Sequence, residues 1–163
     1  MFALSLRIPL PIGVLSLYLF DTNHCSAIIF GNLDILRRVT KVGESLITTS
    51  VITRGELIFM AQNSEQRSAN LARVKEFLKD IGLYFVDEET ADIYGEFKAD
   101  IIAHFGPKER NKRRKTTIEQ LGISDNDLWI AAIALRHHLT IVSQDSDFER
   151  MRQVRELAWE FWL

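Results

Sequence analysis

Apolar and polar positions alternate along the chain in a pattern that predicts strands and helices in turn. Short apolar runs predict strands at residues 17–20, 46–48, 83–86 and 140–143, and a last strand at the sheet edge within 157–163. Apolar residues spaced three and four apart predict helices over 23–30, 32–40, 68–81, 87–104 and 127–136. This alternation favours an α/β fold, in which helices cover both faces of a mostly parallel sheet.

Several polar residues mark where these helices begin. Gly31-Asn32 should end one helix and start the next, and Thr49 or Ser50 can cap the helix that follows the second strand. Apolar side chains nearly encircle that helix, so we expect it to be largely buried. After the fourth strand, Ser146 and Glu149 have the spacing of a capping box, which predicts Ser146 as the N-cap of a short helix.

Composition indicates one globular domain. A chain of 163 residues with 47% hydrophobic and 26% charged residues can bury a substantial core, and we expect a single domain over residues 14–163. Residues 1–13 form an apolar segment, either a surface extension or the result of a start site assigned too early. Arg7, Pro9 and Pro11 interrupt this run, which argues against a signal peptide or membrane span. The single cysteine, Cys25, suits a reducing cytoplasm.

Charge is unevenly distributed. The net charge of −2 argues against attraction of nucleic acid to the whole surface. Residues 105–120 interrupt the strand and helix pattern as a basic insertion of charge +4, which leaves −6 for the remainder of the chain. The insertion is either a solvated loop or a phosphate-binding rim, and its candidate RNA-contacting residues are Lys112, Arg113, Arg114 and Lys115.

Four acids are expected at one edge of the sheet. Asp21 and Asp145 follow predicted strands, and Glu56 and Asp127 are expected in the first turns of helices at the same edge. Right-handed crossovers bring such positions to one side of a parallel sheet. Clustered carboxylates hold protons or bind cations, and oxygen ligands alone select Mg²⁺ or Mn²⁺ over zinc. Mg²⁺ prefers sites that substrate phosphates complete, which points to phosphoryl transfer.

Asp147 is an alternative to Asp145 as the fourth acid. In the first turn of the short helix, the negative charge of Asp147 would interact favourably with the helix dipole, which is a structural reason for an acid there. Asp145 has no such alternative role in the sequence, so we favour Asp145. A histidine base is not required, although His24 lies near Asp21 in the sequence.

Four segments of the chain, residues 17–23, 50–57, 127–135 and 140–148, resemble the ordered motifs of PIN-domain ribonucleases, and most closely those of VapC-type toxins of bacterial toxin–antitoxin pairs. The resemblance implies a three-layer sandwich, Mg²⁺- or Mn²⁺-dependent endonucleolytic cleavage of RNA, a homodimer and a cognate antitoxin that blocks the site. By position, it implies that the catalytic, metal-binding acids are Asp21, Glu56, Asp127 and Asp145, with Asn23 and Ser143 as supporting polar groups. The segment before Val14 and the basic insertion depart from the family pattern and put substrate choice in doubt.

Other function classes remain open at this point. A PIN-fold nuclease can process RNA outside a toxin pair, and a non-catalytic module can bind RNA or a partner protein. Such a module would not need all four acids, and all four are present. A phosphotransferase of the haloacid-dehalogenase type would need a second aspartate two positions after the first, where this chain has Asn23.

Overall fold

A five-stranded sheet lies at the centre of the computed structural model, which describes residues 16–162. All neighbouring strands are parallel, and their order is β3-β2-β1-β4-β5. The chain therefore builds outward from β1 in both directions, and β1 and β4 meet at the point where the order reverses. The strands are β1 Tyr18–Phe20, β2 Ile47–Ser50, β3 Gly82–Tyr84, β4 Thr140–Val142 and β5 Trp159–Glu160.

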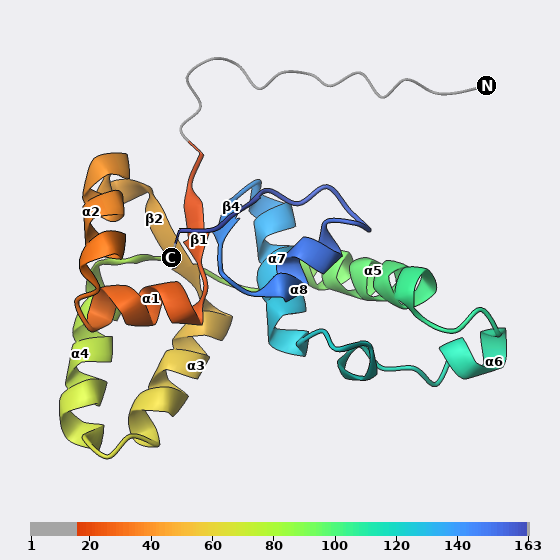
Figure 1. Cartoon of the computed structure of the whole chain (residues 1–163), viewed down its shortest axis with the longest axis horizontal. Helices are drawn as coiled ribbons and strands as arrows, with labels where there is room; N and C mark the ends of the chain where they lie inside the picture. The colour runs from red at the N-terminus through yellow and green to blue at the C-terminus, as the bar shows by residue number, and fades with distance from the viewer. Residues whose placement is uncertain (1–15, 163) are drawn as a thin grey trace.

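Helices cover both faces of this sheet, so the molecule has three layers (Figure 1). One face carries α1 Thr22–Ile29, α2 Leu33–Val42, α3 Val51–Gln62 and α4 Arg67–Asp80, and the other carries α5 Glu88–Phe105, α7 Asp125–His137 and α8 Ser146–Met151. Short 3-10 turns occupy Glu44–Leu46 and Glu119–Leu121. The predicted α/β sandwich with a parallel sheet is confirmed.

The core consists of two apolar clusters, one on each face of the sheet. Successive strand residues point to opposite faces. Leu19 and Ile141 accordingly pack with α5, α7 and α8, whereas Phe20 and Val142 pack with α1 to α4, and all four side chains are fully buried. Burial on both faces is what a parallel sheet requires.

The predicted helix starts at two of these elements are confirmed. Asn32 caps α2, since its side chain accepts hydrogen bonds from the backbone of Asp34 and Ile35. Ser50 caps α3, since its hydroxyl accepts the N–H of Thr53 at 3.1 Å.

The prediction that α3 is largely buried is wrong. Leu57 and Ala61 are buried, but Phe59 is 66% exposed and Met60 is 44% exposed. The reason is visible in Figure 1, where α3 and α4 form a hairpin that extends beyond the sheet. Leu57 and Ala61 therefore pack with α1 and α4, and Ile52 at the start of α3 packs against the core of the other face, while the part of α3 beyond the sheet has exposed apolar side chains.

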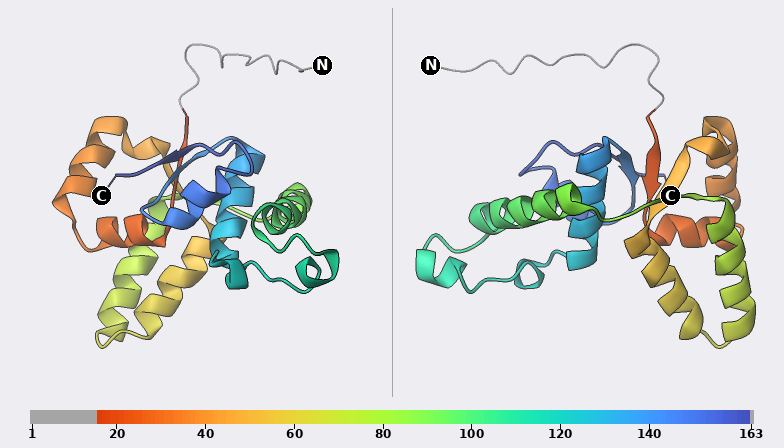
Figure 2. Two further views of the ribbon diagram at one scale, coloured as in Figure 1. Left: turned by 45° about the vertical axis from the view of Figure 1, so that its right-hand side comes forward. Right: turned by 180° about the vertical axis from the view of Figure 1, so that it is seen from behind.

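Residues 105–120 leave the body of the molecule between α5 and α7. They contain α6 Arg110–Arg113, which lies at the edge of the molecule away from the sheet in both views of Figure 2, whereas Ile118 near the end of this segment is fully buried in the core. The apolar segment predicted over residues 1–13 lies outside the described residues. Within residues 16–162, none of the helices combines the length and the apolar character that a membrane crossing requires.

Candidate active site

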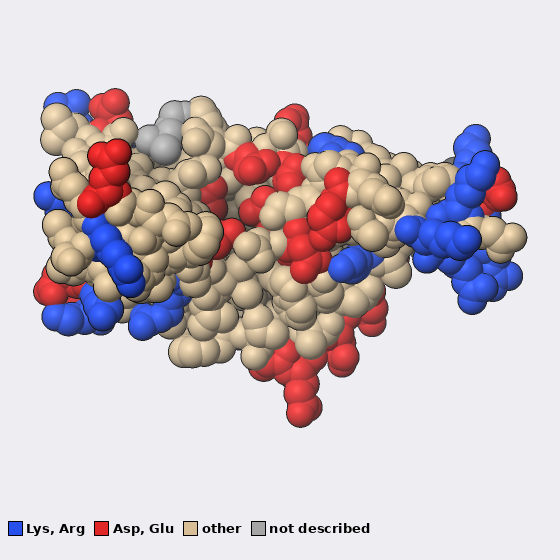
Figure 3. Space-filling view, turned by 90° about the horizontal axis from the view of Figure 1, so that it is seen from below, with Lys and Arg blue, Asp and Glu red and all other residues tan. Residues whose placement is uncertain are grey.

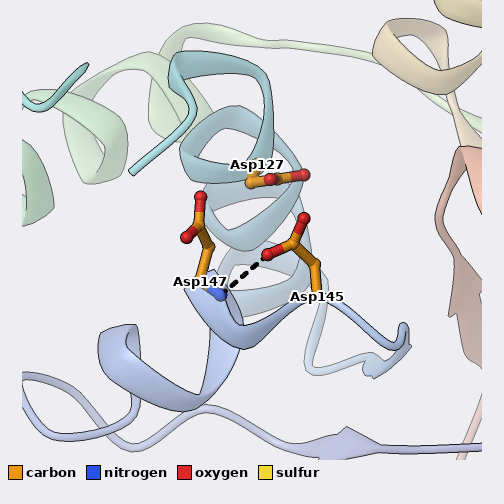
Figure 4. A group of neighbouring side chains, drawn as sticks. All are labelled: Asp127, Asp145 and Asp147. Atoms are coloured by element: carbon orange, nitrogen blue, oxygen red, sulfur yellow. Dashed lines mark hydrogen bonds between the residues drawn. The ribbon is translucent and has the colours of Figure 1, made fainter. Parts of the chain in front are cut away.

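Three aspartates converge between α7 and α8. Asp127 is the third residue of α7, and Asp145 and Asp147 lie at the start of α8, just beyond the carboxyl end of β4. One carboxylate oxygen from each lies within 4.8 Å of the others. Figure 4 shows the three side chains pointing toward one another from these two helices. The structure thus brings together two of the four predicted acids and the alternative, Asp147.

The start of α8 differs from the prediction. Asp145, not Ser146, is the N-cap, because its Oδ1 accepts the N–H of Asp147 at 2.9 Å (Figure 4). Asp147 in turn accepts the N–H of Ser124 at 2.8 Å, which ties α8 to the start of α7. The expectation that Asp145, unlike Asp147, has no structural role is therefore wrong. Each of these two acids has both a backbone partner and a place beside Asp127.

Asp21 is buried directly after β1 and is held by several hydrogen bonds. Its Oδ1 caps α1 by accepting the N–H of His24 at 2.8 Å, and Nδ1 of His24 lies 2.9 Å from the same oxygen. Its Oδ2 accepts the hydroxyl of Ser143, and the Ser143 oxygen accepts the N–H of Asp145 at 2.9 Å. Ser143 therefore joins the ends of β1 and β4, a position suited to a supporting role.

Glu56 lies in the second turn of α3, not in the first as the sequence suggested. Its Oε1 accepts a hydrogen bond from the amide of Asn126 at 2.7 Å, and its Oε2 accepts one from the hydroxyl of Thr22. Our reasoning from the sequence missed both partners. Each directly adjoins a predicted acid in the chain, Thr22 after Asp21 and Asn126 before Asp127, and that adjacency is the signal that could have identified them.

Asn23, the other predicted supporting residue, is exposed. It lines an open depression together with Gln144, Ser26 and Asn32. His24, which the sequence placed near the site without a role, is fully buried against Asp21. Its position three residues after a capping aspartate explains how its backbone and ring both reach one carboxylate oxygen.

The acids act on one another electrostatically. Burial, and then the charges of Asp145, Asp147, Glu56 and Asp21 in that order, raise the pKa of Asp127 to about 8. Burial also raises the pKa of Asp147, an effect that the Ser124 N–H opposes. The charge of every other acid predicted for the site therefore raises the pKa of Asp127. Without a cation it holds a proton at neutral pH, and a bound cation would relieve this repulsion.

The basic residues of the insertion lie apart from the acids. Lys112 pairs with Glu109 at 2.9 Å, and the guanidinium of Arg113 reaches the carbonyl of Lys108 at 3.4 Å. Figure 3 shows acidic side chains over the middle of the molecule, and lysine and arginine side chains at both ends, most densely at the end that α6 forms. Lys112, Arg113, Arg114 and Lys115 are thus outside the acidic centre.

Most of the chain matches a known protein family. The family model described as PIN domain matches residues 18–154. This chain belongs to the PIN domain family. The resemblance seen in the four sequence motifs is confirmed, and the acids described above lie within the matched part of this PIN domain.

Individual relatives are similar over nearly their whole length. Ribonuclease VapC2 of Haemophilus influenzae is 29% identical over 144 residues, which cover 87% of this PIN-domain chain and 97% of the relative. The DNA-bound VapBC structure from Salmonella typhimurium superposes with a TM-score of 0.71 at 24% identity, covering 91% of this chain and 99% of that one. VapBC2 from Rickettsia felis, bound to promoter DNA, gives 0.68 at 22% identity, with 90% and 99% covered. The relationship to VapC ribonucleases is distant, and the structural likeness establishes the fold.

Proposed function

We propose that this PIN-domain protein is a metal-dependent endoribonuclease that cleaves phosphodiester bonds in RNA. The observation that carries the proposal is the convergence of Asp127, Asp145 and Asp147 within 4.8 Å beyond the carboxyl end of β4. Ligands bind at this edge of open α/β sheets. An oxygen-only set of donors suits Mg²⁺ or Mn²⁺, and the distant VapC relatives are named ribonucleases.

The proposed catalytic, metal-binding acids are Asp21, Glu56, Asp127 and Asp145, with Asp147 as the alternative fourth acid. When bound there, Mg²⁺ or Mn²⁺ would neutralise charge on the scissile phosphate and lower the pKa of water.

The other residues of the site hold these acids in position. Ser143 and His24 fix the Asp21 carboxylate, and Thr22 and Asn126 fix that of Glu56. Asp127 must lose its proton to become a ligand, so metal affinity should rise with pH up to about 8.

An RNA cleavage assay tests the proposal. Cleavage should require Mg²⁺ or Mn²⁺, stop on addition of EDTA and be lost in Asp127→Asn. The matched control is Asp125→Asn, the same isosteric change two residues earlier on α7, where the carboxylate pairs with Lys98 at 3.0 Å. The control variant should retain metal-dependent cleavage. Activity that survives complete removal of metal, or full activity of Asp127→Asn, would contradict the proposal.

We further propose that the protein is the toxin of a type II toxin–antitoxin pair and a homodimer. The toxin role is supported by the similar structures from Salmonella typhimurium and Rickettsia felis, which are named VapBC, and by one from Klebsiella pneumoniae, which is named a toxin–antitoxin complex. The homodimer rests on the resemblance of the four motifs to VapC-type toxins. Expression in bacteria should arrest growth, and co-expression of a small neighbouring gene should relieve the arrest. Cleavage without growth arrest would instead indicate an RNA-processing nuclease. Light scattering of the purified protein tests the dimer.

The basic insertion is proposed to guide RNA. Lys112, Arg113, Arg114 and Lys115 carry four positive charges, and backbone phosphate contacts release counterions. Neutralising all four should weaken RNA binding and flatten its salt dependence without changing metal affinity. An unchanged salt slope would identify the segment as a solvated loop.

A further inference from the structure

The insertion and α5 together form a pocket away from the acids. Its walls are Ala99, Ile102 and Ala103 of α5, and Arg110, Arg113, Arg114 and Thr116 of the insertion. Its volume of ≈ 310 Å³ is near the lower end of the range of about 300–1,000 Å³ that small-molecule sites occupy. It has room for one nucleotide-sized group.

Three arginines line this single hollow. In the part of the chain that the structure describes, no carboxylate lies within 4.0 Å of Arg110, Arg113 or Arg114, whereas the neighbouring Lys112 is neutralised by Glu109. Arg113 is partly buried, and its one hydrogen bond noted above goes to a backbone carbonyl, which leaves its charge uncompensated. Three like charges around a small space attract an anion, and the planar fork of arginine matches phosphate oxygens in pairs.

The α5 wall of the pocket is apolar. Ala99 and Ala103 are one helical turn apart and exposed, and Ile102 lies beside them on the same face. Alanine side chains leave room for a planar group to approach the helix. Thr116 closes the pocket, with its hydroxyl donating to the carbonyl of Lys112 at 3.0 Å. One wall of the pocket is thus positively charged and the other is apolar.

We propose that this pocket is a nucleotide subsite, in which the three arginines hold one phosphate and the attached base or ribose lies against Ala99 and Ala103. The nucleotide belongs either to the RNA substrate or to a free mononucleotide. The first source rests on the proposed ribonuclease function. Because α6, which contributes Arg110 and Arg113 to the pocket, lies at the end of the molecule away from α8 (Figure 1), the pocket would select RNA long enough to reach both sites.

Binding in EDTA separates this subsite from catalysis. Three probes are titrated against the full chain: a labelled single-stranded oligoribonucleotide, adenosine 5′-monophosphate and inorganic phosphate. The test variant is the triple Arg110→Gln, Arg113→Gln, Arg114→Gln, and the matched control is the triple Lys108→Gln, Lys112→Gln, Lys115→Gln. Both triples remove three charges from the same segment, but the three lysines do not line the pocket.

The arginine triple should weaken oligoribonucleotide binding at least tenfold more than the lysine triple, because paired hydrogen bonds are lost as well as charge. Replacing the three arginines by lysine should not restore the affinity, since lysine cannot form the paired contacts. Ala103→Leu keeps every charge and fills the pocket, so it should also weaken binding. Unchanged circular dichroism spectra confirm that the variants fold.

If the arginine and lysine triples lost equal affinity for the oligoribonucleotide and Ala103→Leu had no effect, the subsite would be overturned. General electrostatic attraction between the basic segment and RNA would then explain the binding. Arginine-dependent binding of the mononucleotide without any effect on the oligoribonucleotide would assign the pocket to free nucleotides and overturn the RNA source. Failure of the wild-type protein to cleave RNA, with pocket-dependent binding intact, would refute the nuclease proposal alone. Normal metal-dependent cleavage and binding by the arginine triple would refute the subsite alone.

Discussion

Asp127→Asn should stabilise the metal-free protein at neutral pH. The pKa of this carboxyl rises from 3.8 to about 8 in the folded state. At pH 7, which is about three units above the ordinary pKa, the folded protein must protonate this carboxyl. The cost is roughly 1.4 kcal/mol per pH unit, or about 4 kcal/mol. Asp127 is only partly buried, so solvent screening reduces this figure to about 2 kcal/mol. Asparagine has the same shape and avoids this cost.

The sign of the pH dependence follows from proton binding. Between about pH 4 and pH 8 the folded state holds a proton on Asp127 that the unfolded state has lost, so the free energy of unfolding of the metal-free protein falls as pH rises. The asparagine variant lacks this contribution. Its advantage over the wild type should be near zero at pH 4 and should grow until about pH 8.

Thermal unfolding in EDTA at pH 4, 7 and 9 measures this difference. At roughly 2–4 °C per kcal/mol for a domain of this size, the melting temperature should rise by about 4–8 °C at pH 7. Asp125→Asn is the control with the opposite sign: burial raises the pKa of Asp125, but hydrogen bonds from Tyr94 and Lys98 outweigh it and leave that pKa lowered. A loss of stability in Asp127→Asn of similar size at all three pH values would refute the reasoning.

Three further outcomes can be measured. Ser143→Ala should lower the free energy of unfolding by about 1–2 kcal/mol and weaken Mg²⁺ binding about tenfold in calorimetry, because Asp21 and the Asp145 N–H both lose a partner. Unchanged Mg²⁺ affinity would contradict this. Asp145→Asn, which retains an N-cap acceptor, should abolish cleavage with little loss of stability, and Asp147→Asn should do the reverse; the opposite pattern would assign the fourth acid to Asp147. Burial raises the pKa of the Cys25 thiol to about 12, so iodoacetamide at pH 8 should label it only after denaturation, as mass spectrometry can show.

The sequence alone determined the order of strands and helices and the edge of the sheet at which the acids lie. Both depend on local signals: apolar periodicity defines each element, and the carboxyl ends of parallel strands meet at one edge. Asp21 and Asp127 could therefore be placed before the fold was known. The caps at Asn32 and Ser50 were also predictable, because a cap contacts residues two or three positions away.

Only the tertiary structure decided how the side chains pair. Thr22 and Asn126 reach Glu56 from segments 34 and 70 residues away, and no local pattern records such contacts. The exposure of Phe59 depends on how far α3 extends beyond the sheet, which periodicity does not encode. At α8, the sequence predicted Ser146 as the cap, and the structure has the cap one residue earlier, at Asp145. The Asp145 N–H donates to the Ser143 hydroxyl oxygen, and that hydroxyl donates to Asp21 after β1, so a contact between the ends of two strands helps to hold Asp145 in its capping position.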